Sequence, residues 1–282
     1  MTSMTGKTVL ITGATNGIGL VTAGALAAMG ARVFLHGRSA ERGQAALDGI
    51  KAKTPAAQVE FLKAELTSLA AVRALAEEVQ RRAPKLDVLL NNAGAMNASR
   101  TVTADGFETT FGVNHLAPFL LTNLLLERIK GSAPARIVTV ASEAYRAQRI
   151  HFDDLNLERG YSAMTAYGQS KLANILFTRA LAKRLQGTRV TANCLHPGVV
   201  RTGFGKNNKG FIGALFKVVG VFFISPEAGA QTSIHLASAP EVDGVSGAYF
   251  DNKKIKVPAR EGRDDAAAER LWTVSAEMTG LS

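Results

Sequence analysis

The sequence is poor in the residues that build disulfide-rich or metal-stabilised proteins. Its 282 residues contain a single cysteine, Cys194, which excludes an internal disulfide and a multi-cysteine zinc site. The five histidines are scattered without the spacing of metal ligands, so we expect none of them to hold a metal. Because cysteine-poor chains of this kind are typical of a reducing compartment, we expect a cytoplasmic location.

Long hydrophobic runs are missing as well. The longest apolar stretch, residues 211–224, contains Lys217 and is shorter than the roughly 20 residues that a membrane-spanning helix needs. The first residues lack the apolar core and the small-residue cleavage site of a signal peptide. We therefore expect neither a membrane span nor export.

Acidic residues are outnumbered by basic ones, 23 against 33, which gives a net charge of +10. Such a charge attracts phosphates, nucleic acids and anionic lipids alike. The basic residues are spread along the chain, with a modest cluster at residues 253–263, and they do not alternate with aromatic residues as nucleic-acid sites do. We therefore interpret the charge as a solvated basic surface and expect no nucleic-acid partner.

Hydrophobic residues, by contrast, make up 46% of the chain, enough for a packed core. Short runs rich in β-branched residues alternate with segments of helical periodicity, which is typical of βαβ units. Runs such as residues 137–140 lack polar alternation, which indicates burial on both faces and a parallel sheet. The predicted strands are residues 8–11, 31–36, 59–62, 88–91, 136–142, 189–195 and 248–250.

These elements predict one α/β domain of the doubly wound Rossmann type over residues 1–282. We expect a mostly parallel, seven-stranded sheet with helices on both faces. An insert at about residues 203–224 and a C-terminal extension at about residues 251–282 complete the predicted domain. Sheets of this type bind their ligands at the carboxyl ends of the strands, so we expect the functional residues at those ends.

A glycine-rich turn directly follows the first predicted strand, and a helix begins near Ile18. Glycines allow backbone conformations that are closed to other residues and let a pyrophosphate approach the positive end of a helix. Because strand, turn and helix follow one another in this order, we interpret the turn as a dinucleotide site rather than an ordinary loop. The candidate cofactor contacts in it are Gly13, Thr15, Asn16, Gly17, Ile18 and Gly19.

Arg38 follows the second predicted strand, at a position where an NAD enzyme usually carries an acidic residue for the ribose hydroxyl. An arginine there can pair with a 2′-phosphate, whereas an aspartate would repel it. The sequence therefore favours NADP(H), with NAD(H) as the alternative, unless Arg38 is simply a surface cation.

Tyr167 and Lys171 are four residues apart in a predicted helix and therefore share one of its faces. An ammonium about 4 Å from a phenol favours the phenolate by roughly 4 kcal/mol at an effective dielectric constant of 20. Although burial opposes part of this effect, we expect the pKa of the phenol to move towards neutrality, where a general acid or base works best. Ser142 ends the fifth predicted strand and can hold a reacting oxygen. Asn114 lies near the start of a helix, where its amide can bridge cofactor, water and lysine.

Taken together, these motifs resemble the short-chain dehydrogenase/reductase family. The matching motifs stand in family order over almost the whole chain: the glycine turn, residues 91–94 (Asn-Asn-Ala-Gly), Asn114, Ser142, Tyr167 with Lys171, and residues 196–202 (His-Pro-Gly-Val-Val-Arg-Thr). Residues 113–122, 170–177 and 229–233 are similar to the retinol dehydrogenase-like branch of that family. At the adenine contact the chain departs from its relatives, because Ala64-Glu65 stands where they usually carry an aspartate.

The resemblance implies a role for each matching residue. Tyr167 would be the catalytic acid or base, Lys171 would lower its pKa and hold the nicotinamide ribose, Ser142 would orient the reacting oxygen, and Asn114 would complete a proton relay. Residues 143–162 would line the substrate entrance. The further cofactor contacts that it implies are Glu65, Leu66, Asn92, Ala93, Gly94, Pro197, Gly198, Val200 and Thr202, beside Tyr167 and Lys171.

The expected function is hydride transfer between NADP(H) and a small lipophilic aldehyde, ketone or alcohol. Two alternatives stay open: reduction of a carbon–carbon double bond, and a nucleotide-sensing module without turnover. Residues 204–224 stand where this family places its substrate flap, and their apolar side chains suit either contact with a membrane surface or packing in the core or a dimer. A homo-oligomer is compatible with the sequence.

Overall fold

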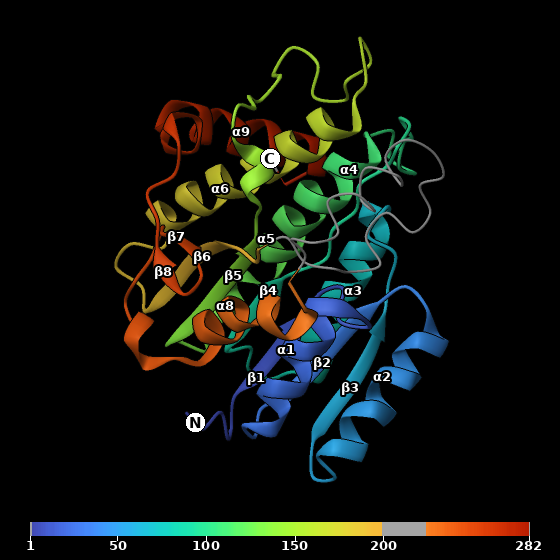
Figure 1. Cartoon of the computed structure of the whole chain (residues 1–282), viewed down its shortest axis with the longest axis vertical. Coiled ribbons are helices and arrows are strands. Elements are labelled where there is room, and N and C mark those ends of the chain that lie inside the picture. The colour runs from blue at the N-terminus through green and yellow to red at the C-terminus, as the bar shows by residue number, and fades with distance from the viewer. Residues whose placement is uncertain (1, 199–223, 282) are drawn as a thin grey trace.

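The computed structural model describes residues 2–198 and 224–281, and its eight strands in those ranges form one sheet (Figure 1). Their order is β3-β2-β1-β4-β5-β6-β7-β8. The first seven strands are parallel to their neighbours, and β8 is antiparallel to β7. The strands are β1 (Thr8–Ile11), β2 (Arg32–Gly37), β3 (Gln58–Lys63), β4 (Val88–Asn91), β5 (Ala135–Val140), β6 (Val190–His196), β7 (Tyr249–Asp251) and β8 (Lys254–Ile255).

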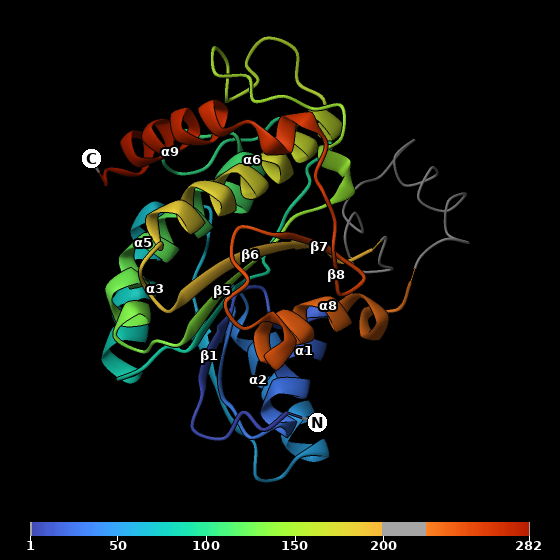
Figure 2. The same cartoon turned by 90° about the vertical axis from the view of Figure 1, so that its left-hand side faces the viewer.

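Helices cover both faces of this sheet, as the two views in Figures 1 and 2 show. On one face lie α1 (Gly17–Ala28), α2 (Ala40–Lys53) and α8 (Pro226–Ser238). On the other lie α3 (Leu69–Arg82), α5 (Ala117–Lys130) and α6 (Ala163–Arg184), with α9 (Asp265–Thr279) packed outside α6. Short helical segments are α4 (Thr109–Phe111), η1 (Gly112–Leu116), η2 (Glu143–Tyr145), η4 (Pro240–Val242) and η5 (Arg260–Arg263).

The surroundings of strand β1 show why strands of this sheet are uninterrupted apolar runs in the sequence. Leu10 belongs to the core cluster under α3, α5 and α6, whereas Val9 and Ile11 belong to the cluster under α1, α2 and α8. Successive side chains of a strand point to opposite faces, so a strand buried on both sides has no position left for polar residues. The predicted doubly wound fold is confirmed.

The strand count differs from the prediction, because a short eighth strand pairs with β7. The turn between them is formed by Asn252 and Lys253, both with positive φ, of 47° and 65°. Two-residue hairpin turns of this kind usually carry glycine, which is missing here. The exposed strand β8 is only two residues long. The sequence therefore shows neither the glycine of a hairpin turn nor the pattern of a strand. Strand β5 also ends earlier than predicted, at Val140, and Ser142 lies beyond it.

The predicted C-terminal extension folds back onto the domain as β8, η5 and α9. Trp272 of α9 packs its ring against Phe119 of α5 and Phe177 of α6, with ring centres 5.0 and 5.9 Å away. The predicted insert lies outside the described residues, apart from Ile224. Within the described ranges, every helix is too short or too polar to cross a membrane.

Candidate active site

The strand order reverses between β1 and β4, and the segments that follow these two strands meet at the carboxyl edge of the sheet. Thr12, just after β1, joins them, because its Oγ1 accepts hydrogen bonds from the backbone N–H groups of Asn92 and Ala93, both at 3.0 Å. The Asn92 side chain donates to the carbonyl oxygens of Thr12 and Gly13, at 2.9 and 3.1 Å. Asn92 is therefore used to hold the glycine turn in place.

The turn itself leaves no room for side chains at two of its glycines. A Cβ on Gly19 would lie 2.4 Å from the carbonyl oxygen of Gly13, and a Cβ on Gly13 would lie 2.8 Å from Cα of Ala93. Gly13 also has a φ of +65°, which favours glycine. Helix α1 starts directly behind the turn, and its N-cap residue Asn16 makes no side-chain capping hydrogen bond with described residues. The Asn16 side chain thus caps none of the first N–H groups of α1 within the described residues, and the turn with this helix start fits a pyrophosphate.

The predicted contacts for the rest of the nucleotide lie at the ends of β2 and β3. Arg38 is exposed directly after β2, next to Ser39, which caps α2. Glu65 is exposed after β3, whereas Leu66 is buried and lines a small apolar hollow together with Ala93. The structure therefore brings these positions to one sheet edge but turns the Leu66 side chain into the core.

Tyr167 and Lys171 lie side by side on α6. Nζ of Lys171 is 5.5 Å from the centre of the Tyr167 ring and donates a hydrogen bond of 3.0 Å to the carbonyl oxygen of Val140, at the end of β5. Lys171 is 3% exposed, and Tyr167 is half-buried. The predicted pairing of phenol and amine is thus present at the carboxyl edge of the sheet.

The expected fall of the phenol pKa towards neutrality is wrong for this arrangement. Burial raises the pKa of Tyr167 to about 12, although a hydrogen bond with Ser142 acts in the opposite direction. Burial likewise lowers the pKa of Lys171 to about 8. Desolvation is the larger effect on the phenol, and it also disfavours the charge of the ammonium that would stabilise the phenolate. Tyr167 is therefore a protonated phenol at neutral pH.

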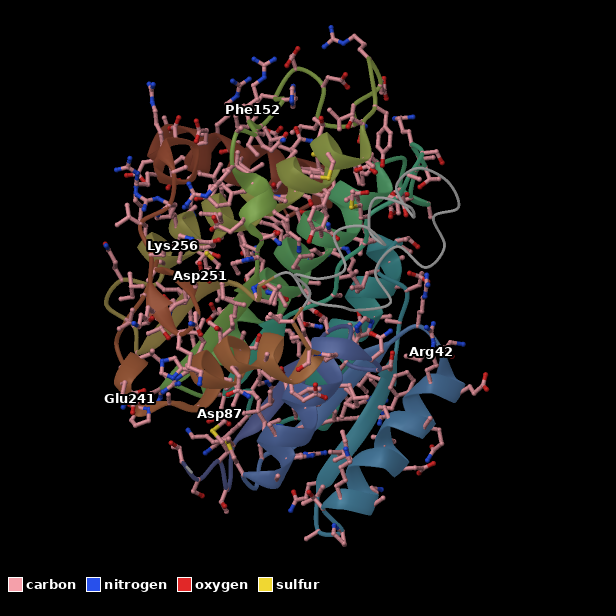
Figure 3. The ribbon with its side chains drawn as sticks, viewed as in Figure 1. Arg42, Asp87, Phe152, Glu241, Asp251 and Lys256 are labelled. Carbon is pink, nitrogen blue, oxygen red and sulfur yellow. The ribbon has the colours of Figure 1, made fainter. Side chains whose placement is uncertain are left out.

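Ser142 begins the segment η2 rather than ending a strand, and its Oγ accepts from the N–H of Ala144 at 3.2 Å. The next residue, Glu143, anchors this segment to the far edge of the sheet. Its Oε1 accepts from the hydroxyl of Tyr249 at 2.6 Å and lies 3.3 Å from Nζ of Lys256. Lys256 also donates to Asp251 at 2.8 Å, and both carry labels in Figure 3.

These neighbours favour the negatively charged form of the Glu143 side chain. Burial alone would raise its pKa, but hydrogen bonds from Tyr249 and Arg146 lower it to about 2. The backbone N–H of Glu143 also donates to Nδ1 of His196, at 3.3 Å, which links the Ser142 segment to the end of β6. The segment that carries Ser142 is therefore fixed from two sides.

Asn114 lies in η1, a π-helical turn just before α5. Its Oδ1 accepts from the N–H of Ala95 at 2.6 Å, and its Nδ2 donates to the carbonyl oxygen of Ala95 and to Oγ of Ser170, both at 2.9 Å. Ser170 in turn donates to the carbonyl oxygen of Tyr167 at 2.7 Å. The amide of Asn114 thus connects the segment after β4 to the helix of Tyr167, so its side chain holds these elements together.

The remaining predicted contacts follow β4 and β6. Gly94 is exposed beyond Ala93, and Pro197 and Gly198 directly follow β6. Gly198 has a φ of +85°, and a Cβ there would lie 2.5 Å from Cδ1 of Ile224. Val200 and Thr202 lie outside the described residues.

Three residues of the site were not found by sequence reasoning: Thr12, Ser170 and His36. The N–H of Gly13 donates to Nδ1 of His36 at 3.3 Å, and its Nε2 lies 3.2 Å from the carbonyl oxygen of Ala64. Thr12 and His36 act through hydrogen bonds to distant backbone groups, and Ser170 binds the side chain of the remote Asn114. Such contacts leave no local pattern in the sequence. Only the position of Thr12, between the first strand and the glycine turn, could have suggested it.

Comparison with known proteins agrees with this geometry. The family model of the short chain dehydrogenases matches residues 7–210. The chain is 47% identical over 294 residues to retinol dehydrogenase 14 of Homo sapiens, covering 99% of this chain and 88% of the relative. It is 48% identical over 276 residues to retinol dehydrogenase 12 of Mus musculus, covering 98% and 87%.

Solved structures show the same fold. An uncharacterised protein from Mycobacterium paratuberculosis, 35% identical, superposes with a TM-score of 0.80 and covers 99% of this chain and 96% of its own. A Pseudomonas aeruginosa RhlG complex with NADP, 28% identical, has a TM-score of 0.71 and covers 88% and 95%. The chain therefore belongs to the short-chain dehydrogenase family of nicotinamide-dependent oxidoreductases, in its retinol dehydrogenase-like branch.

Proposed function

We propose that this protein transfers hydride between NADP(H) and a lipophilic aldehyde, ketone or alcohol. The observation that carries the proposal is the arrangement of Ser142, Tyr167 and Lys171 at the sheet edge that also holds the glycine turn. A protonated phenol, hydrogen-bonded to a serine and next to an amine, is a complete proton-transfer site.

The glycine turn supports a dinucleotide cofactor, because its close backbone contacts and the start of α1 form an anion cradle. Gly13, Gly17 and Gly19 would lie against the pyrophosphate, and Arg38 would pair with the 2′-phosphate of NADP(H). This exposed arginine is the basis for preferring NADP(H) over NAD(H). Two structural relatives are complexes with NADP, which is compatible with the preference.

When bound, the nicotinamide supplies or accepts the hydride. In the direction of reduction, Ser142 would donate a hydrogen bond to the carbonyl oxygen of the substrate and hold it next to the hydroxyl of Tyr167. Tyr167 would then give its proton to that oxygen as the carbonyl carbon gains the hydride, so that an alcohol forms. The raised pKa of Tyr167 keeps this proton in place at neutral pH and therefore suits reduction. Lys171 would stabilise the phenolate that remains.

An apolar substrate is supported by the relatives and by an exposed apolar side chain near Tyr167. The relatives named retinol dehydrogenases act, by their names, on an apolar alcohol. In this chain, Met164 lies three residues before Tyr167 in the first turn of α6 and is 54% exposed. An exposed methionine one helical turn before the reacting phenol suits an apolar, flexible substrate.

The test is consumption of NADPH with a graded series of aldehydes and ketones and one conjugated enone, repeated with NADH. We expect turnover that increases with chain length and is faster with NADPH. Tyr167→Phe should abolish turnover while NADPH still binds.

Each other outcome contradicts the proposal. Reduction of the enone at its double bond alone would identify a different reaction. Binding of NADPH without turnover of any substrate would identify a nucleotide-sensing module. Full activity of Tyr167→Phe would exclude the proposed proton donor.

A further inference from the structure

The short helical segment η2 carries Ser142 at its N-terminal end and contacts elements that are remote in the sequence. Ser142 is the residue that holds the reacting oxygen in the proposed reaction. Its Oγ accepts a hydrogen bond from the backbone N–H of Ala144, at 3.2 Å. A hydroxyl that accepts from the backbone keeps its own proton for another partner. The conformation of η2 therefore decides where Ser142 can donate this proton.

One side of η2 packs against helix α6 directly next to Tyr167. A Cβ on Gly168, the following residue of α6, would lie 2.6 Å from the carbonyl oxygen of Ala144 and 2.5 Å from Cγ of Gln148. An approach this close is possible only because Gly168 has no side chain. The backbone of η2 and the helix of Tyr167 are in contact at this point. A shift of η2 away from α6 would therefore move Ser142 relative to Tyr167.

The carboxylate of Glu143 ties η2 to the last strands of the sheet. Its Oε1 accepts from the hydroxyl of Tyr249 in β7 at 2.6 Å and lies 3.3 Å from Nζ of Lys256, which follows β8. Nζ of Lys256 also donates to Asp251 at 2.8 Å, and these two residues lie near each other in Figure 3. Hydrogen bonds that involve a charged group are stronger than those between neutral groups. Glu143 thus joins η2 to β7 and to the start of the C-terminal extension.

Tyr145 makes a second connection between η2 and the C-terminal extension. Its side chain is 0% exposed, and its hydroxyl oxygen accepts from the backbone N–H of Ala259 at 2.8 Å. Ala259 lies between β8 and η5. The ring of Tyr145 also packs edge-on against that of Tyr249, with the ring centres 5.8 Å apart. The C-terminal extension therefore contacts η2 at two residues, Glu143 and Tyr145.

We infer that the C-terminal extension, through Lys256 and Ala259, holds η2 against α6, and that Glu143 is thereby a positioning residue for Ser142. The inference rests on the proposed function only for the importance of Ser142 in catalysis. Without the carboxylate of Glu143, the hydroxyl of Tyr249 and the ammonium of Lys256 no longer hold η2. The segment is then free to move off α6, and the hydroxyl of Ser142 loses its fixed direction.

The first test needs no substrate and measures the hydrogen exchange of two backbone N–H groups by NMR. The N–H of Ala144 binds Oγ of Ser142, and the N–H of residue 143 binds Nδ1 of His196. In Glu143→Leu we expect the protection factors of both to fall at least about tenfold, because η2 opens more often. Glu143→Gln keeps an acceptor for the hydroxyl of Tyr249, so its effect should be smaller.

The second test is kinetic and uses a carbonyl compound that the parent protein reduces. Glu143→Leu should lower kcat by at least about tenfold, because the reacting oxygen is held less well. The dissociation constant of NADPH should stay unchanged, since the glycine turn is not part of this network. Glu143→Leu combined with Ser142→Ala should be no slower than Ser142→Ala alone, because both changes act through one hydroxyl. A merely structural role of Glu143 would lower kcat further in the double variant.

A matched control and a second variant accompany both tests. Glu60→Leu removes another ion-paired carboxylate of similar exposure, 36% against 26%, from β3 at the other edge of the sheet. It should leave the protection of the Ala144 N–H and kcat unchanged. Should Glu143→Leu fail to fold, Lys256→Met keeps the apolar part of the lysine side chain and removes only its ammonium. It should lower the protection of the Ala144 N–H in the same direction, to a smaller extent.

Parent-like protection of the Ala144 N–H in both Glu143→Leu and Lys256→Met would overturn the inference, as would an equal loss in Glu60→Leu. An additive loss of kcat in the double variant with Ser142→Ala would overturn it as well. If the parent protein reduces no compound of the series, the proposed function fails, whereas the exchange measurement still decides whether Glu143 holds η2.

Discussion

The backbone N–H of Gly13 donates a hydrogen bond to Nδ1 of His36, across 3.3 Å. Nε2 of the same ring reaches the carbonyl oxygen of Ala64, and the carbonyl oxygen of His36 accepts from the N–H of Ala14. The ring must therefore be neutral, with its proton on Nε2. One buried histidine thus connects the glycine turn after β1 with the segment after β3.

This relationship predicts that His36→Leu weakens cofactor binding more than catalysis. Leucine fills the space but leaves the N–H of Gly13 without its acceptor, so the turn loses its fixed position. Loss of one hydrogen bond of this kind costs about 1.5 kcal/mol, and we expect the dissociation constant of NADPH to rise about tenfold. Titration of NADPH fluorescence measures it.

His151→Leu is the matched control, since His151 lies half-buried after β5, far along the chain from the glycine turn. It should leave the dissociation constant unchanged. An unaltered NADPH affinity in His36→Leu would show that the ring does not support the turn.

We predict opposite effects on stability when each of two glycines of α1 is replaced by alanine. A Cβ on Gly19 would lie 2.4 Å from the carbonyl oxygen of Gly13, whereas a Cβ on Gly24 would meet only Cγ1 of Ile50, at 3.8 Å. Gly19→Ala should therefore destabilise the protein by about 1–3 kcal/mol and abolish NADPH binding. Gly24→Ala should stabilise it by about 0.5–1 kcal/mol, because alanine favours the helix.

Urea denaturation and NADPH titration of both variants decide the matter. The paired design separates the close approach of the backbone from general helix propensity, since both glycines lie in one helix. NADPH binding by Gly19→Ala as tight as that of the parent protein would contradict the proposed cradle.

The fold could be predicted from sequence because its pattern is local. A two-sided apolar strand such as β1, followed by a glycine turn and a helix, allows few arrangements other than a covered parallel sheet. Strand β8 escaped prediction because its pairing depends on a hairpin turn through Asn252 and Lys253, for which the sequence shows no glycine. The early end of β5 escaped for a similar reason, since Ser142 caps η2 instead of continuing the ladder.

The candidate site, too, could be predicted only in part from the sequence. The spacing of Tyr167 and Lys171 in one helix places them together, but it cannot give the balance between burial and charge that raises the phenol pKa. That balance depends on how deeply α6 packs against the sheet. The sequence assigns no role to His36 or His115, because their partners Gly13 and Ser275 are remote in the chain.

We predict that Arg38 determines the preference for NADPH over NADH. Its exposed guanidinium stands after β2, and replacing it with an acid would put like charges next to a 2′-phosphate. In Arg38→Asp we expect the ratio of kcat/KM for NADPH to that for NADH to fall at least about tenfold. Lys51→Asp, the same charge change near the other end of α2, is the control and should leave the ratio unchanged. A preference for NADPH that survives in Arg38→Asp would assign the choice to other residues.

Moderate acid should destabilise the protein, because two buried histidines must stay neutral in the fold. Burial lowers the pKa of His36 to about 4 and that of His115 to about 3, against about 6.5 in an unfolded chain. Between those values the unfolded state binds more protons than the folded state. The free energy of unfolding should therefore fall as the pH falls from about 6.5 towards 4.

Urea denaturation at several pH values across that window measures the slope. Between pH 6.5 and 4 each of the two histidines costs the fold at most about 3 kcal/mol. His36→Leu should therefore be less stable than the parent at neutral pH yet lose less stability on acidification. If His36→Leu kept the slope of the parent protein, the imidazole of His36 would have to be charged in the folded protein, and its Nδ1 could not accept the hydrogen bond from Gly13.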